Sequence, residues 1–128
     1  MKLNPDCIRD ILLKVEEIPD VHHHWDFTPQ NIPEIFPNYT CEEIIYHIRQ
    51  CELCGFLLHS SHSVNYDYYS VSDLTPSGHE FLNNVRENTV WNGVKEVAVK
   101  VGATSLSALI QISSNVITQL IKAQFGLL

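Results

Sequence analysis

The 128-residue sequence predicts a mainly helical α+β fold, in which a small helical core carries a β-hairpin and is followed by two further helices. Three observations support this prediction. Apolar residues recur at helical spacing in several segments. Residues typical of helix N-termini precede most of these segments. One stretch, rich in aromatic and β-branched residues, has the composition of a two-stranded hairpin.

The first helix is predicted from Asn4 to about Glu17. Asn4 followed by Pro5 is typical of an N-cap and a first helical position. Pro19 ends the segment. The apolar residues of this helix recur on one face and are Ile8, Ile11, Leu12 and Val15.

The next segment, VHHHWDFT (residues 21–28), is predicted to be a short strand or an extended stretch. Alternation would place Val21, His23, Trp25 and Phe27 on one side of it and His22, His24 and Asp26 on the other. Prolines at 29, 33 and 37 then bracket IPEIF, which leaves room for a single helical turn.

A well-delimited helix is predicted from Thr40 to Cys54. Thr40 and Glu43 have the spacing of a capping box, and Gly55 is a typical C-terminal stop. The inner face is predicted to comprise Cys41, Ile44, Ile45, Ile48 and Cys51.

The hairpin is predicted within FLLHSSHSVNYDYYSVSDL (residues 56–74), around its polar SSHSVN stretch. Thr75 and Pro76 then open another helix, in the same way as Asn4 and Pro5. Its apolar residues are Phe81, Leu82 and Val85.

The order helix, short strand, one-turn helix, capped helix and hairpin is that of a winged helix-turn-helix. We therefore predict a winged-helix-like core over residues 1–87 and a two-helix extension over residues 88–128. In the extension, apolar residues from Val90 to Val101 mark a long helix ended by Gly102, and Thr104 caps a second one.

The last helix has more apolar surface than one exposed face should carry, together with small residues such as Ser105, Ser107, Ser113 and Ser114. Either it packs back on the core or it forms the seam of a homodimer, and patterning does not separate the two.

Four segments of this sequence resemble a known family: MKLNPDCIRDILLKVEE, YHIRQCELCGF, LTPSGHEFLNNVR and SLSALIQISSNVI. The sequence is similar over nearly its whole length to an uncharacterised domain-of-unknown-function family, carried mainly by phages and prophages of Gram-positive bacteria. The resemblance implies a winged-helix core and a phage-associated setting, and it brings no enzymatic activity. The sequence departs from the family pattern at HHHWD and at Cys51, where an aliphatic residue is expected.

The formal net charge of −7 is unevenly distributed. Residues 1–87 hold 14 acids against 5 bases, whereas residues 88–128 hold 3 bases against 1 acid. Neither part has the basic stripe that binding to a polyanion normally needs, because phosphate neutralisation supplies most non-specific affinity for nucleic acids.

We expect a soluble, cytoplasmic protein without membrane contact. No apolar run approaches the roughly 18 residues of a membrane span, and the first residues lack an export signal. The four cysteines are then expected to be reduced thiols. Since no nucleophile elbow, phosphate-binding glycine loop or HExxH motif is present, we expect neither enzymatic activity nor a cofactor.

Two groups of residues resemble metal ligands. In CELCGFLLHSSH (residues 51–62), Cys51 and Cys54 are suitably paired, but the spacer to His59 and His62 is far too short for a finger-type site. We therefore expect Cys51 to pack in the core.

His22, His24 and Asp26 form the second group. Alternate strand positions lie about 6.6 Å apart on one face, so these side chains could offer two imidazoles and a carboxylate to a metal. We favour a solvated face over this metal site, because a motif match alone is weak evidence.

The capped helix occupies the recognition-helix position of a winged fold, so its outer face is the candidate surface for a partner or for DNA. The residues predicted there are Glu42, Glu43, His47, Arg49, Gln50 and, near the end of the helix, Glu52. Its acidic residues match phosphates poorly, which favours a protein partner over DNA.

Tyrosines of the hairpin complete the candidate surface. Tyr66 and Tyr68 could stack on bases or anchor a protein interface, while alternation predicts that at least one of Tyr66, Tyr68 and Tyr69 faces the core.

The function expected from these observations is binding rather than catalysis. Our first hypothesis is a small acidic phage-associated protein that docks on a host or phage protein, as a regulator or an anti-defence factor, by occupying a nucleic-acid-binding site. The alternative is a DNA-binding transcriptional regulator that dimerises through its last helix. A third hypothesis is a metalloprotein that uses His22, His24 and Asp26.

Overall fold

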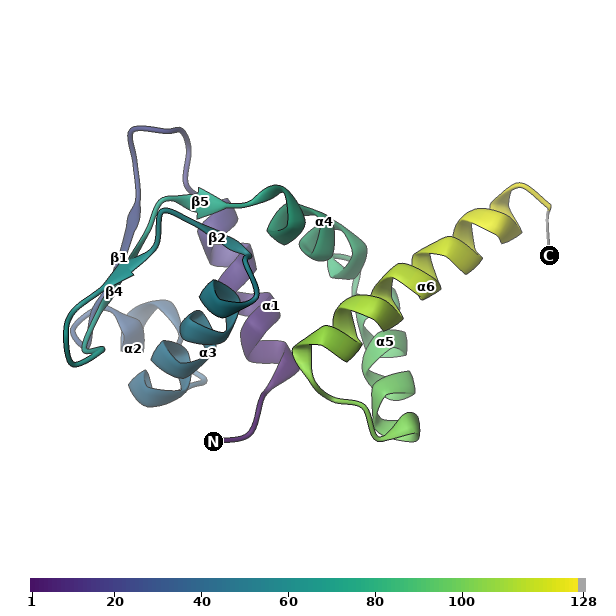
Figure 1. Ribbon diagram of the computed structural model, residues 1–128, viewed down its shortest axis with the longest axis horizontal. Helices are drawn as coiled ribbons and strands as arrows, with labels where there is room; N and C mark the ends of the chain where they lie inside the picture. Colours follow the sequence, from purple (N-terminus) through teal and green to yellow (C-terminus); the bar gives the residue numbers. More distant parts are fainter. Residues whose placement is uncertain (127–128) are drawn as a thin grey trace. The chain divides into compact units, whose positions relative to one another are not determined.

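The computed structural model describes residues 1–126, which form six helices and two small antiparallel sheets (Figure 1). The predicted α+β class is therefore confirmed. The chain divides into two compact units, Met1–His79 and the residues from Glu80 onward, whereas the sequence placed a boundary after Glu87. Residues 127–128 of the predicted extension lie outside the described residues.

The first unit contains three helices and all five strands, and it ends within the fourth helix. Their bounds are α1 (Pro5–Glu16), β1 (Trp25–Phe27), α2 (Ile32–Ile35), α3 (Cys41–Leu53), β2 (Leu57–Leu58), β3 (Ser61–His62), β4 (Tyr69–Val71), β5 (Asp73–Leu74) and α4 (Pro76–Val85).

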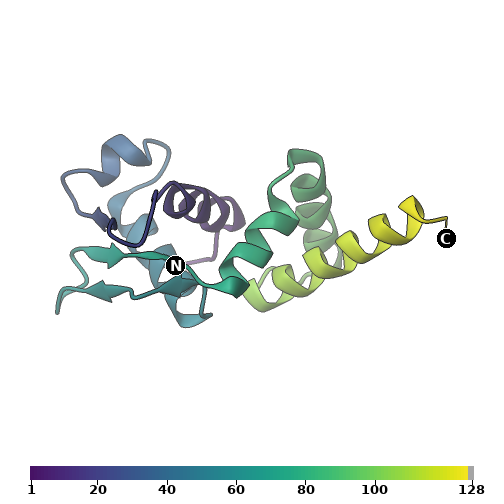
Figure 2. The ribbon, with the colours of Figure 1, turned by 90° about the horizontal axis from the view of Figure 1, so that it is seen from above.

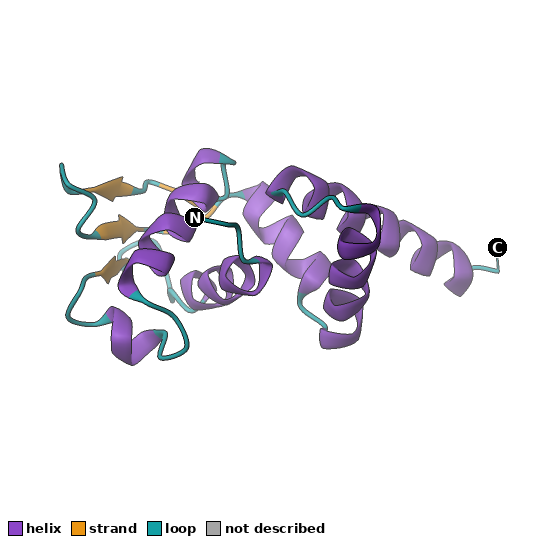
Figure 3. Cartoon of the chain, turned by 90° about the horizontal axis from the view of Figure 1, so that it is seen from below, coloured by secondary structure: helices purple, strands orange, loops and turns teal. Residues whose placement is uncertain are grey.

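The strands form one interrupted hairpin with β1 added at its side. The order β1-β4-β3 makes a three-stranded sheet, and β2 pairs with β5 in a second sheet of two strands. All pairs are antiparallel. The strands lie side by side in Figure 3, and the two arms of the hairpin run together to its tip in Figure 2.

The predicted hairpin is confirmed, but each of its arms is split into two strands. His59 adopts a left-handed backbone conformation, with φ of 50°, between β2 and β3. Such a residue breaks the regular ladder and turns the chain. The outer part of the hairpin, with β3 and β4, therefore pairs with β1 instead of continuing the sheet of β2 and β5.

Helix α1 begins where the sequence predicts. The side chain of Asn4 accepts a hydrogen bond from the backbone N–H of Asp6 at 3.0 Å, and Pro5 occupies the first helical position. The apolar face of α1 is buried and contacts α3 and β5. The core of this unit is formed by Cys7, Ile8, Ile11, Leu12, Val15, Phe27, Ile32, Phe36, Ile44, Ile48, Cys51, Phe56, Leu57, Tyr69, Val71 and Leu74.

The predicted strand VHHHWDFT is shorter than expected. Only Trp25–Phe27 form β1, whereas residues 21 and 22 lie in a turn. The carboxylate of Asp20 holds this turn, because it accepts hydrogen bonds from the His22 backbone N–H at 2.8 Å and from the His23 ring at 2.7 Å. These hydrogen bonds lower the pKa of Asp20. The alternation assumed for the histidines was therefore wrong.

The second unit contains α5 (Asn88–Val101) and α6 (Leu106–Gln124), which pack on each other. Gly102 ends α5 in a left-handed conformation with φ of 67°, as its position in the sequence predicts. The cap of α6 was wrongly assigned, since Ser105 and not Thr104 accepts the hydrogen bond from the Ala108 backbone N–H.

The exposure of α6 changes along its length. Leu106, Leu109 and Ser113, in its first half, are buried, whereas Leu120 and Ile121 are each about half exposed. The first half thus packs within the unit and the second half presents an apolar surface. Within residues 1–126, no helix has the length and the apolar character that a membrane span requires.

Candidate functional site

A groove of about 530 Å³ lies between α3 and the tip of the hairpin. Helix α3 supplies Glu42, Ile45, Tyr46 and Arg49 to its lining. The hairpin tip supplies Asn65, Tyr66 and Asp67, and Pro29 and Cys41 complete the lining. Helix α3 and the tip of the hairpin that follows it therefore meet around one open cavity, which we call the α3–hairpin groove.

The wall formed by α3 is fixed by the predicted capping box. The Thr40 hydroxyl accepts from the Glu43 backbone N–H at 3.1 Å, and the Glu43 carboxylate accepts from the Thr40 backbone N–H at 3.0 Å. Caps of this kind contribute about 1 kcal/mol. The helix therefore starts at a defined residue, which sets the direction of every side chain on the groove wall.

The opposite wall depends on a tightly hydrogen-bonded hairpin tip. The Ser63 hydroxyl accepts from the backbone N–H groups of Asp67 at 2.8 Å and Tyr68 at 3.3 Å, while the Tyr66 N–H donates to the Ser63 carbonyl at 3.0 Å. Tyr66 has φ of 57°, which is uncommon for a bulky side chain. Local strain of this kind persists only where its surroundings impose it, and it is frequent at functional sites.

The Tyr66 ring joins the two walls. The Arg49 guanidinium of α3 lies over the ring, 4.9 Å from its centroid. His62 stacks with the same ring at a centroid distance of 4.0 Å and an interplanar angle of 17°. The contact with Arg49 is a cation–π interaction, which contributes about 0.5–1 kcal/mol at exposed sites. The groove is thus preformed in the free protein.

The hairpin is anchored below its tip by Glu52. Its carboxylate accepts hydrogen bonds from the Tyr69 hydroxyl at 3.2 Å and from the Ser60 hydroxyl at 2.6 Å. Tyr69 is fully buried, which confirms that one tyrosine of this segment faces the core. Burial, with the neighbouring Glu52 carboxylate as a further cause, raises the pKa of the Tyr69 hydroxyl, so this group stays protonated as a donor.

The structure brings together three of the residues predicted as a partner surface: Glu42, Arg49 and Tyr66 all line the groove. Glu43 is used in the helix cap. Gln50 and Tyr68 are at least partly accessible on α3 and on the hairpin, but neither lines the groove.

His47 was wrongly placed on the outer face of this helix, because it is fully buried. Its Nε2 accepts a hydrogen bond from the Asn4 backbone N–H at 2.8 Å. Its Nδ1 lies 2.6 Å from the Glu43 carbonyl, which can only accept, so Nδ1 carries the proton. Burial lowers the pKa of His47. This neutral histidine ties the start of α1 to α3 and contributes nothing to a binding surface.

The predicted metal ligands His22, His24 and Asp26 do not converge. The His24 ring lies 3.3 Å from the Asp26 carboxylate, while His22 is in the turn that Asp20 holds. In the part of the chain that the structure describes, no group of three or more histidine, cysteine, aspartate or glutamate residues could hold a metal ion.

The two cysteines of CELCGFLLHSSH differ in exposure, since Cys51 is buried and the residue Cys54 is exposed. Cys51 is fully buried in the core, as its position on the inner face of α3 predicts. Burial raises the pKa of Cys51 well above its usual value and raises that of Cys54 to about 11. Both thiols therefore remain protonated at neutral pH, a state that disfavours nucleophilic attack.

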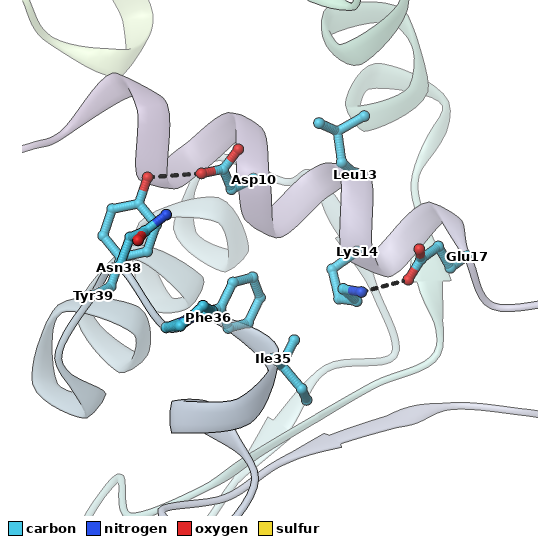
Figure 4. Close-up of a pocket in the computed structure, with 9 residues that line it drawn as sticks. Asp10, Leu13, Lys14, Glu17, Ile35, Phe36, Asn38 and Tyr39 are labelled. Carbon is cyan, nitrogen blue, oxygen red and sulfur yellow. Dashed lines mark hydrogen bonds and ion pairs between the residues drawn. The ribbon is translucent and has the colours of Figure 1, made fainter.

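A smaller cavity of about 230 Å³ lies between α1 and the segment after α2 (Figure 4). In it the Tyr39 hydroxyl donates to the Asp10 carboxylate at 2.7 Å, and Lys14 pairs with Glu17 at 2.8 Å. These four polar side chains already have partners, and the Tyr39–Asp10 hydrogen bond attaches the connection between α2 and α3 to α1. We therefore assign this cavity a structural role.

Sequence reasoning missed the apolar part of the groove. Ile45 was assigned to the core, but it is only partly buried and lines the groove together with Tyr46. The spacing in α3 contains a signal that could have found Ile45. Ile44 and Ile45 are adjacent, and two adjacent helical residues cannot both point to the centre of one face.

Comparisons with known proteins give a family and one relative. A family model with the description "Hypothetical protein (DUF2513)" matches residues 2–105. An "Uncharacterized protein" of Haemophilus influenzae is 30% identical over 129 residues, which cover 94% of this chain and 99% of that protein. No solved structure matches the chain.

Proposed function

We propose that this chain, which belongs to the DUF2513 family of hypothetical proteins, is a non-enzymatic protein that acts by binding another protein. In this proposal it is associated with a phage, the partner is a host or phage protein, and binding serves regulation or defence evasion. The phage setting rests on the family resemblance of its sequence motifs.

We propose further that the first unit is a winged helix-turn-helix. The order α1-β1-α2-α3-hairpin and the sheet order β1-β4-β3 support this assignment. In such a fold α3 has the position of a recognition helix and the hairpin that of the wing. The scaffold serves many functions, so the choice among them depends on the chemistry of the α3 face.

The acidic character of that face is the observation that carries the proposal. Glu42 and Asp67 line the α3–hairpin groove, while the one cation of α3, Arg49, lies over the Tyr66 ring. A surface that approaches DNA must neutralise phosphates first, and the carboxylates that line the groove repel them. Acidic groups on a small protein instead suit a partner with a basic surface, including a site that otherwise binds nucleic acid.

The proposal is tested by capturing partners from a lysate of the bacterial host with the full chain, with and without nuclease treatment. We expect a discrete protein that remains bound after nuclease treatment and that the double variant Glu42→Lys/Asp67→Lys captures poorly. The matched control is Val21→Lys, a change at an exposed position outside the groove. Loss of all captured protein on nuclease treatment would contradict the proposal.

The alternative is a DNA-binding regulator, favoured by the position of Arg49 and Gln50 on α3. It requires salt-dependent affinity of the purified protein for duplex DNA, weakened by Arg49→Ala and abolished by deletion from Thr104 onward. Binding of this kind would replace the protein-docking proposal. Unchanged binding by both variants would exclude the regulator.

For the second unit we propose a homodimer through the exposed half of α6. Residues 106–121 contain no charged side chain. In a two-fold interface the same surface of both copies meets, so the absence of charge removes the self-repulsion that otherwise opposes such contacts. Leu120 and Ile121 are each about half exposed and supply the apolar area. A groove of about 430 Å³, lined by Val97, Val116 and Leu120 among others, borders them.

The variant Leu120→Glu is expected to convert this dimer to a monomer, because each contact would gain two buried carboxylates without partners. Sedimentation analysis over a range of protein concentrations measures the change. Val21→Glu, at an exposed position of the first unit, is the matched control and should leave the mass unchanged. A parent protein that is monomeric at every concentration would refute the dimer.

A further inference from the structure

The charges around the α3–hairpin groove favour a cationic ligand. Two carboxylates, Glu42 and Asp67, line the groove against the single guanidinium of Arg49, which lies 4.9 Å from the centre of the Tyr66 ring. The surrounding unit, Met1–His79, contains 12 acids and 4 bases. A cleft with low-dielectric walls concentrates such a field, so the groove attracts positive groups and repels negative ones.

The walls between these charges are apolar. Ile45 and Tyr46 lie one after the other on α3, and Pro29 faces the same cavity from the segment before α2. Its volume of about 530 Å³ falls in the range of about 300–1,000 Å³ that is usual for ligand clefts. Such a surface binds an apolar side chain, and the two carboxylates that line the groove then favour a cationic group next to that side chain.

The groove is also held in place before anything binds. Tyr66 is fixed by the hydrogen bonds of Ser63, by the stacked His62 ring and by the Arg49 guanidinium. A ligand therefore does not have to order the hairpin tip on binding, which removes one of the main costs of association.

The inference rests on the proposed function, in which the chain binds a protein. We infer that this groove binds a segment of the partner that carries an apolar or aromatic side chain beside a lysine or arginine. The apolar side chain lies against Ile45, Tyr46 and Pro29. The neighbouring cation pairs with Glu42 or Asp67. Acidic segments and nucleic-acid backbones are excluded by the same two carboxylates.

The test is a selection of random 12-residue displayed peptides on the full-length protein, followed by affinity measurements with the synthetic peptides that are enriched. We expect these peptides to share an apolar or aromatic residue within a few positions of lysine or arginine. Raising the salt concentration should weaken their binding several-fold, because part of the attraction is between accessible charges.

Three variants identify the site. Ile45→Glu is expected to reduce peptide affinity at least 10-fold, because the loss of an apolar anchor residue of an interface has an effect of this size. The double variant Glu42→Lys/Asp67→Lys should lose the basic peptides and, in a new selection, enrich acidic ones. Val99→Glu, at an exposed apolar position of α5 outside the groove, is the matched control and should bind as the parent does.

If Ile45→Glu fails to fold, the double variant Glu42→Lys/Asp67→Lys, which we call the charge-reversal variant, still tests the inference. Both of its altered side chains are on the surface. Enrichment of acidic peptides by the parent, equal binding by the parent and the charge-reversal variant, or a selection that enriches nothing would overturn the inference. Preferential binding of a nucleic-acid probe at this groove would overturn it as well.

The proposed function and the groove inference would be contradicted by different results. Suppose that a protein partner stays bound after nuclease treatment, and that it binds Ile45→Glu and the charge-reversal variant as tightly as it binds the parent. This result would overturn the groove inference, while the protein-docking proposal would stand. If the capture experiment returns nucleic acid only, the proposed function itself is wrong, whatever the peptides show.

Discussion

His47→Leu is expected to lower the free energy of unfolding by about 1–3 kcal/mol, the usual cost of leaving a shielded polar group without its partner. Leucine fills much of the space of the imidazole but accepts no hydrogen bond, so the Asn4 N–H loses the acceptor that now lies 2.8 Å away. Urea unfolding followed by far-ultraviolet circular dichroism measures the change.

The same histidine is expected to make stability depend on pH. The pKa of His47 is lowered in the folded state by burial, so below about pH 6.5 the unfolded chain binds a proton before the folded chain does. Stability should therefore fall as the pH decreases from about 6.5 toward 5, by up to about 1.4 kcal/mol per unit. Protonation of Nε2 would also place a donor against the Asn4 N–H.

His47→Gln is the matched control for both expectations. The glutamine amide can accept from one neighbour and donate to the other, but it does not titrate. We expect a smaller loss of stability than with leucine and a shallower decline between about pH 6.5 and 5 than in the parent. Identical pH profiles of the parent and both variants would show that His47 is not the group responsible.

Gly78→Ala is expected to destabilise the first unit by about 1–3 kcal/mol, the usual cost of overpacking. A Cβ at this position would lie 2.5 Å from the backbone carbonyl oxygen of Phe56, which cannot move as a side chain can. The close approach brings α4 against the end of α3, where Thr75 and Ser77 both donate hydrogen bonds to the Gly55 carbonyl. Helix propensity alone would favour alanine by about 1 kcal/mol.

Gly93→Ala is the matched control, since Gly93 is also helical but has open space where its Cβ would be. Here we expect stabilisation by about 0.5–1 kcal/mol, from helix propensity without a clash. Urea unfolding of the two variants beside the parent checks the opposite signs. An increase in stability with Gly78→Ala would refute the close contact with Phe56.

The stability predictions and the binding proposal for the first unit depend on different residues. The expected changes in stability depend on the contacts of His47 and Gly78, neither of which lines the groove. The proposed binding depends on Ile45, Glu42 and Asp67, which line the groove and are not fully buried. Variants of these two sets therefore separate loss of folding from loss of recognition.

Short-range signals in the sequence predict several of the helix ends. Asn4 with Pro5, Thr40 with Glu43, and Gly102 act within one turn of their own position, so the bounds of α1 and α3 and the end of α5 could be predicted from neighbouring residues alone. The cap of α5 by Glu87 was not predicted. The hairpin and the core position of Cys51 followed in the same way from composition and spacing.

Which residues of α3 face inward depends on contacts that form only in the folded chain. His47 is buried because the start of α1 offers it a backbone N–H from 43 residues away, and Ile45 stays accessible because the hairpin tip ends beside it and forms a groove. The position of Tyr66 likewise depends on Arg49 of another element. Local signals reach one helical turn, whereas burial and shared cavities depend on segments that meet only in the folded chain.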